Sequence, residues 1–187
     1  MKMSKLGYFS EFFLFPLLVG IAASCAYREK AVPDPVILTL TFLIAVFGWT
    51  FVEYLLHRVL FHHAPILSLV HEKHHDTPRE LIGTPSWASG LIAMVAVAAP
   101  LIATFGLDLG TAATAGMMTG YLWYVFVHYA SHHWHPRKGS YLYRARTRHA
   151  RHHQNPEAGN FGVTTILWDH IFGTKLSGVA SRAVTTA

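Results

Sequence analysis

Four apolar stretches that contain no Asp, Glu, Lys or Arg constrain the fold of this chain more than any other feature. They cover residues 12–27, 36–52, 87–107 and 110–127, and we expect the second to continue as a helix through residue 56. A helix rises about 1.5 Å per residue, so each stretch approaches the thickness of the hydrocarbon core of a bilayer, roughly 30 Å. None shows the polar stripe of a soluble amphipathic helix. The sequence therefore predicts an all-α integral membrane protein with four transmembrane helices.

The composition agrees with a membrane protein. Of the 187 residues, 52% are hydrophobic and only 13% are charged, and we expect a single membrane domain over residues 1–187. The net charge is +5, but the basic residues are not interleaved with base-stacking aromatic residues, so we expect no nucleic-acid partner. Cys25 is the one cysteine and lies within an apolar stretch, where it is expected to be a small buried residue.

The loops between the apolar stretches indicate the topology. Residues 106–110 (Gly-Leu-Asp-Leu-Gly) predict a tight turn, so the last two spans should form an antiparallel hairpin. With four spans, both termini lie on one side of the membrane, and that side holds all of the 15 lysines and arginines except Arg28 and Lys30. Because Lys and Arg accumulate on the cytoplasmic face, we expect both termini in the cytoplasm, together with a helical cap formed by residues 57–86 and 128–175.

Most of the 14 histidines fall into four clusters near the ends of the apolar stretches. These are His57/His62, His71/His74/His75, His128/His132/His133 and His149/His152/His153. Neutral imidazole is a good ligand for iron, zinc, copper and nickel. On a helix, neighbours such as His74 and His75 lie about 100° apart and can face two different metals. The spacing of five between His57 and His62 does not fit one face of a regular α-helix and predicts a local bulge.

So many converging imidazoles exceed the needs of one metal ion, so the sequence favours a two-metal site. The main alternative is a histidine-rich metal-buffering loop, but such loops lie in one segment, whereas these clusters are attached to different spans. Acidic ligands are scarce. Glu53, four residues before His57, is interpreted either as a partner that orients a histidine or as a hydrogen-bond acceptor within the helix bundle.

The ordered run of these motifs resembles the membrane fatty acid hydroxylase and sterol desaturase superfamily, and within it the fatty acid 2-hydroxylases. The resemblance covers roughly residues 45–175. It is carried by Glu53-Tyr-Leu-Leu-His57-Arg-Val-Leu-Phe-His62, His71-x-x-His74-His75, His128-Tyr-Ala-Ser-His132-His133, Pro136-Arg-Lys-Gly-Ser-Tyr-Leu-Tyr143, His149-x-x-His152-His153 and the segment from Phe161 to Thr174. The branch within the superfamily is indicated mainly by residues 138–143 and by Trp168-Asp169.

This resemblance implies a centre of two iron ions, with zinc as an alternative occupant of purified protein. The implied ligands are His57, His62, His71, His74, His75, His128, His132, His149, His152 and His153, which leaves His133 as a residue beside the ligands. The implied activity is hydroxylation of an acyl chain of a fatty acid or lipid, at carbon 2 for the 2-hydroxylase branch, with dioxygen. The eukaryotic 2-hydroxylases carry an N-terminal haem-binding domain for which this chain has no room, so we expect a separate electron-transfer protein.

Two other functions remain open from the sequence. A carotenoid hydroxylase or a sterol-type desaturase has similar histidine motifs on few spans, although the segment from Phe161 to Thr174 is more similar to the fatty acid group. A non-enzymatic membrane metal-binding protein is the other alternative. Transport would favour polar ligands midway through the spans, whereas these histidines lie at span ends.

Overall fold

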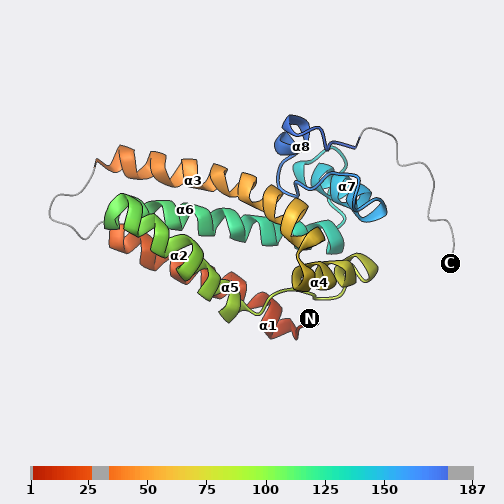
Figure 1. Cartoon of the computed structure of the whole chain (residues 1–187), viewed down its shortest axis with the longest axis horizontal. Helices are drawn as coiled ribbons and strands as arrows, with labels where there is room; N and C mark the ends of the chain where they lie inside the picture. Colours follow the sequence, from red (N-terminus) through yellow and green to blue (C-terminus); the bar gives the residue numbers. More distant parts are fainter. Residues whose placement is uncertain (1, 27–33, 177–187) are drawn as a thin grey trace.

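The computed structural model describes residues 2–26 and 34–176, which are almost entirely helical (Figure 1). The elements are α1 (Lys5–Phe9), α2 (Glu11–Ala26), α3 (Pro35–Leu55), the π-helix η1 (Leu56–Phe61), α4 (Pro65–Asp76), α5 (Ser86–Ile92), the π-helix η2 (Ala93–Ala98), α6 (Ala99–His133), α7 (Tyr141–Gln154) and α8 (Leu167–Ile171). Within the described ranges, the only β structure is an isolated bridge between Lys2 and Ile82. The predicted all-α class is therefore confirmed.

Three helical stretches are long and apolar enough to cross a membrane, where the sequence predicted four. They are Lys5–Ala26, Pro35–Phe61 and Ser86–His133. The third, 48 residues long, contains both predicted spans 87–107 and 110–127. Residue 27 of the first predicted span and the connection up to residue 33 lie outside the described residues.

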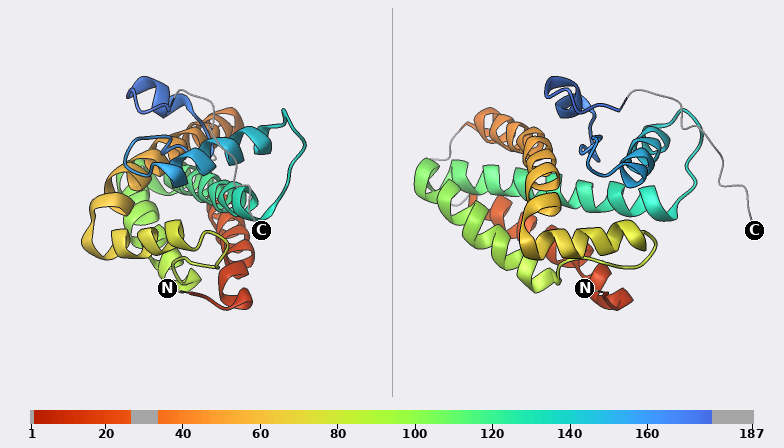
Figure 2. Two further views of the ribbon diagram at one scale, coloured as in Figure 1. Left: turned by 90° about the vertical axis from the view of Figure 1, so that its right-hand side faces the viewer. Right: turned by 45° about the vertical axis from the view of Figure 1, so that its right-hand side comes forward.

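The long third stretch folds back on itself at Gly106. Its φ of 77° and ψ of 176° are not helical, and glycine adopts a positive φ without the steric cost that other residues incur. A Cβ atom at Gly110 would lie 2.5 Å from Ile102 Cα, which means that the two halves approach closely just beyond the bend. Both views show these halves running side by side in opposite directions, as the predicted hairpin requires (Figures 1 and 2).

Small residues allow α3 and α6 to pack closely. A Cβ atom on Gly116 would overlap with the Phe42 carbonyl and lie 2.7 Å from Ala45 Cβ, and one on Gly120 would lie 2.5 Å from Trp49 Cβ. These glycines therefore serve packing within the chain. On the other side of α6, Phe15 of α2 packs against Met118 in a small buried core.

The polar helices gather at one end of this bundle. Figures 1 and 2 show α4 and α7 on either side of the end of α6, where α3 also finishes, with α8 on the same side as α7. Val127, Ala145 and Val163 form a buried cluster that joins α6, α7 and the segment before α8. The chain thus brings residues from four separate regions to one end of the bundle.

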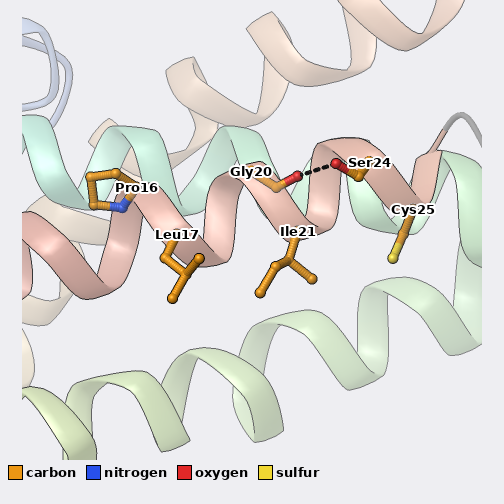
Figure 3. A pocket seen from close by; sticks show the side chains of 6 residues that line it. All are labelled: Pro16, Leu17, Gly20, Ile21, Ser24 and Cys25. Carbon is orange, nitrogen blue, oxygen red and sulfur yellow. Dashed lines mark hydrogen bonds between the residues drawn. The ribbon is translucent and has the colours of Figure 1, made fainter.

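An apolar groove of about 630 Å³ runs along α2 on the side of the bundle (Figure 3). Its lining residues are Pro16, Leu17, Gly20, Ile21, Ser24 and Cys25. The Ser24 hydroxyl donates to the Gly20 carbonyl at 2.7 Å, so its hydrogen is already used within the helix. No histidine lines it, and it takes no part in the site described below.

Candidate metal centre

A π-helical turn places His57 and His62 on one face. The π-helix η1 follows α3 directly, and its hydrogen-bonding pattern brings residues five apart into line. The two rings are nearly parallel, with centroids 5.4 Å apart and an interplanar angle of 22°. The bulge predicted from the spacing of these histidines is therefore confirmed.

The predicted ligands form two groups, and neighbours in the sequence belong to different groups. The first cluster contains His57, His62, His71, His75 and His152, and the second contains His74, His132, His149 and His153. Within each group, one nitrogen from every ring lies within 4.8 Å of the others. Because α4 and α7 each present adjacent histidines in two directions, each of these helices contributes to both clusters.

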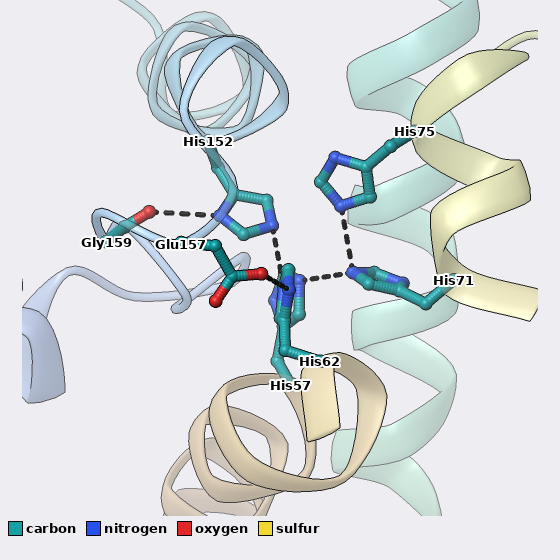
Figure 4. Close-up of polar contacts among 7 residues, drawn as sticks. All are labelled: His57, His62, His71, His75, His152, Glu157 and Gly159. Atoms are coloured by element: carbon teal, nitrogen blue, oxygen red, sulfur yellow. Dashed lines mark hydrogen bonds and ion pairs between the residues drawn. The ribbon is translucent and has the colours of Figure 1, made fainter. Parts of the chain in front are cut away.

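In the first cluster, the ring nitrogens converge from η1, α4 and α7 (Figure 4). His71 Nε2 lies 3.0 Å from the Nε2 atoms of both His57 and His75, and His62 Nε2 lies 3.3 Å from His152 Nε2. So many Nε2 atoms directed into one small space are an arrangement suited to a shared cation.

Three imidazoles of the first cluster are oriented by acceptors on their other nitrogen. His57 Nδ1 donates to the Phe161 carbonyl at 2.6 Å, and His152 Nδ1 donates to the Gly159 carbonyl at 3.0 Å. The third, His62, has Nδ1 3.2 Å from a Glu157 carboxylate oxygen. A proton held on Nδ1 leaves the Nε2 lone pair free, which is the usual arrangement for a metal-bound histidine.

The second cluster is built from α4, α6 and α7. His149 Nε2 lies 2.8 Å from His132 Nε2 and 3.1 Å from His153 Nε2. His128 Nε2 lies 3.1 Å from His74 Nε2, so His128 borders this cluster without belonging to it. The buried Nδ1 atoms of His149 and His153 have no hydrogen-bond partner among the described residues, and in the first cluster the same holds for His75 but not for His57 and His152.

Burial keeps the histidines of α4 and α7 neutral. Removal from water, with a smaller contribution from neighbouring histidines, lowers the pKa of His75 and His152 to about 3. Burial likewise lowers the pKa of His153 to about 4. Neutral imidazoles are metal ligands, whereas imidazolium ions are not. The donor set therefore fits two ions of a metal such as iron or zinc, one per cluster.

Two further predicted residues lie beside the clusters. His133 stacks on Tyr129 with ring centroids 4.3 Å apart and belongs to neither cluster. Glu53 is buried, and its carboxylate accepts hydrogen bonds from Val163 and Thr164; no histidine in the described part of the chain is hydrogen-bonded to it. It touches the segment that carries the Phe161 carbonyl.

Sequence reasoning missed two acidic residues near the first cluster. Glu157 contacts His62, and the fully buried Asp169 accepts hydrogen bonds from the backbone beside Phe161. In the sequence, the Trp168-Asp169 pair contributes only to the family resemblance. A lone acidic residue in a segment of otherwise apolar and small residues is the signal that could have indicated a buried acceptor for Asp169.

A polar cavity of about 320 Å³ opens onto the first cluster. It is lined by Phe61, His62, Ser68, His71, Glu72, His75, Pro156 and Glu157. This smaller cavity, and not the larger groove on α2, is the one that touches the histidines. It gives small polar molecules a path to the first cluster from outside the helix bundle.

The helices and clusters define a protein with apolar helices of membrane-spanning length and two histidine clusters, each suited to a metal ion, at one end of the bundle. The sequence matches the family model described as "Fatty acid hydroxylase" over residues 42–174. The chain belongs to the fatty acid hydroxylase family, a family of oxidoreductases.

Named relatives agree with this assignment. The chain is 36% identical over 156 residues to fatty acid 2-hydroxylase of Mus musculus. The matched region covers 77% of this chain and 41% of the relative. It is 32% identical over 154 residues to dihydroceramide fatty acyl 2-hydroxylase FAH2 of Arabidopsis thaliana. That match covers 75% of this chain and 63% of the relative. The chain thus matches about two fifths of the length of the mouse relative.

The fold is also similar to a solved structure. That structure is described as full-length scs7p with only the hydroxylase domain visible. The two share 25% sequence identity and superpose with a TM-score of 0.78, over 91% of this chain and 67% of the other. The helical arrangement described above is therefore one that a hydroxylase domain is known to adopt.

Proposed function

We propose that this protein is a membrane hydroxylase that introduces a hydroxyl group into the acyl chain of a fatty acid or lipid, at carbon 2. The observation that carries the proposal is the pair of histidine clusters at the end of apolar helices. The match to the fatty acid hydroxylase family supports the acyl substrate, and the names of the mouse and Arabidopsis relatives support carbon 2.

Each cluster is proposed to hold one iron ion, and the ten predicted histidines are the proposed ligands. The two irons, supplied with dioxygen and electrons, would provide the oxidising power that attacks an unactivated carbon–hydrogen bond. The chain's own contribution is to hold neutral imidazoles in place. His128 is included because its Nε2 lies 3.1 Å from that of His74.

The substrate and the reductant are proposed to approach from different directions. An acyl chain dissolves in the bilayer and would reach the end of the bundle along its apolar surface. The reductant is proposed to be a separate electron-transfer protein. The exposed cations Arg137 and Lys138, just before α7, and Arg144 in its first turn offer either a lipid headgroup or such a protein a cationic contact.

We further propose four membrane crossings with both termini and the metal centre in the cytoplasm. The bend at Gly106 divides the third long stretch into two antiparallel halves, and this supports a count of four. The distribution of Lys and Arg supports the cytoplasmic orientation, since only Arg28 and Lys30 fall on the other side.

Mass spectrometry of lipids tests the proposed activity. Cells that express the chain, supplied with iron and a reductant source, are compared with cells that express His132→Ala, because His132 lies in the second cluster. We expect acyl species that gain one oxygen atom only with the unmodified chain, and fragmentation should place the hydroxyl at carbon 2. Identical lipid profiles from iron-loaded protein would refute the acyl hydroxylase, and oxygenated carotenoids or new sterol double bonds would identify the alternatives.

A further inference from the structure

Two buried carboxylates fasten the backbone of residues 161–164 beside the first cluster. Glu53 at the end of α3 is 2% exposed, and Asp169 in α8 is fully buried. One oxygen of Glu53 accepts from the backbone N–H groups of Val163 at 2.7 Å and Thr164 at 2.9 Å. The other accepts from the Thr164 hydroxyl at 2.5 Å.

Asp169 holds the first half of the same segment. One of its oxygens accepts from the Phe161 N–H at 2.9 Å and from the Thr174 hydroxyl at 2.8 Å. Its other oxygen accepts from the Gly162 N–H at 2.9 Å. Four consecutive backbone N–H groups thus donate to two carboxylates, which fixes the orientation of the carbonyl groups between them.

These carbonyl groups contact the first cluster. The Phe161 carbonyl accepts from His57 Nδ1 at 2.6 Å. The Gly159 carbonyl accepts from His152 Nδ1, and its neighbour Asn160 is tied by its N–H to the Thr174 carbonyl at 2.9 Å. Since Thr174 also donates to Asp169, one carboxylate supports both of these acceptors.

We propose that Glu53 and Asp169 are positioning residues for the first metal site. They fix the carbonyl groups that hold the proton of His57 and His152 on Nδ1, which directs each Nε2 lone pair at the metal. The inference rests on the proposed metal-binding function of the clusters. It is specific to one cluster, because in the described part of the chain His149 and His153 of the second cluster have no Nδ1 acceptor.

The two carboxylates should respond differently to their amide analogues. Each oxygen of Asp169 faces a backbone N–H group, so Asp169→Asn would direct an NH2 group at a donor. Only one oxygen of Glu53 faces backbone N–H groups. In Glu53→Gln that oxygen remains, and the new NH2 group can donate to the Thr164 hydroxyl.

The affinity for cobalt tests the proposal without any catalytic readout. The full chain is purified in detergent, and Co²⁺ binding is measured by chelator competition in two backgrounds. His132→Ala/His153→Ala leaves the first cluster intact, and His62→Ala/His75→Ala leaves the second intact.

In the background that retains the first cluster, Asp169→Asn and Glu53→Ala should weaken Co²⁺ binding about 10- to 100-fold, the usual range for loss of a group that orients a metal ligand. Glu53→Gln should restore most of the affinity lost in Glu53→Ala. None of these changes should alter the affinity of the second cluster for Co²⁺. Glu11→Ala is the matched control, because Glu11 is a buried carboxylate that accepts from Ser89 and Tyr121, and it should alter neither affinity.

Equal losses at both clusters, or no loss at the first, would overturn the proposal. If the stronger variants do not fold, Thr164→Val removes only the hydroxyl bond to Glu53 and should weaken the first cluster alone, by about threefold. The absence of Co²⁺ binding in both backgrounds before any further change would instead refute the proposed metal function itself.

Discussion

The division of adjacent histidines between two clusters predicts opposite outcomes for two similar pairs of substitutions. His71→Ala/His152→Ala removes two imidazoles from the first cluster, whereas His152→Ala/His153→Ala removes one from each cluster. Each pair removes two partly or fully buried imidazoles from the same end of the bundle. A general loss of stability should therefore be similar in the two proteins.

The expected metal content follows from the nitrogens that remain. The first pair leaves the first cluster with His57, His62 and His75, fewer than the four ligands that a closed metal site usually requires. The second cluster stays whole, so the metal content should fall from about two ions per chain to about one. The second pair leaves four histidines in the first cluster and three in the second, and the adjacent His128 makes four available at the second as well. This protein should keep about two ions, bound less tightly.

Zinc suits this measurement because it has no redox chemistry of its own. Each variant is loaded with Zn²⁺ in detergent and dialysed against a weak chelator, and its metal content is then measured by plasma mass spectrometry against protein from amino-acid analysis. Equal zinc content in the two double variants would refute the assignment of neighbouring histidines to separate clusters.

Three further outcomes are expected. Gly116→Val should overpack the contact of α6 with Phe42 and Ala45 and lower the free energy of unfolding by about 1–3 kcal/mol. Gly48→Ala should leave the free energy of unfolding unchanged, because a Cβ there meets no atom within 4 Å. Equal unfolding temperatures for the two variants would contradict this packing. Metal-free protein should unfold at a lower temperature at pH 5 than at pH 7. The histidines of the unfolded chain gain protons below about pH 6.5. In the folded protein, the lowered pKa values keep His75, His152 and His153 neutral down to about pH 3 to 4, so acid favours the unfolded chain. An unfolding temperature that does not change between pH 7 and pH 5 would refute this linkage. His133→Ala should bind zinc as tightly as the unmodified chain, whereas His132→Ala should bind it less tightly, because the His133 ring stacks on Tyr129 outside both clusters.

The sequence was sufficient for those features that depend on local spacing. Apolar stretches without charge predicted the helices, and the five-residue spacing of His57 and His62 predicted the bulge that the structure shows as a π-helix. The divergence of His74 and His75 followed from the 100° step of a helix. In each case the relevant geometry is set by residues a few positions apart.

Features that depend on distant backbone groups were not predictable. The acceptor for His57 is the carbonyl of Phe161, 104 positions away, and every residue in the chain carries such a carbonyl. Which carbonyl accepts this hydrogen bond depends on how the segment before α8 packs against the end of α3. The same packing explains why Glu53 pairs with backbone N–H groups and not with a histidine.

The number of long helical stretches also differed from the expectation, for a local reason. The prediction separated spans at a turn covering residues 106–110, whereas helical hydrogen bonding continues on both sides of a bend at Gly106. One residue with a positive φ reverses the direction of the chain with little loss of helix.

The return of residues 159–174 to α3 has a consequence for the order in which the protein matures. A chain under synthesis exposes His57 and His62 long before the ribosome adds the carbonyl groups of Gly159 and Phe161 that orient the first cluster. The histidines of η1 and α4 therefore lack the backbone acceptors and the α7 histidines of the first cluster until nearly the whole chain has been made. If the clusters hold metal as proposed, ordered binding at the first cluster requires the finished polypeptide, and a chain that stops at residue 158 should bind ions there less tightly.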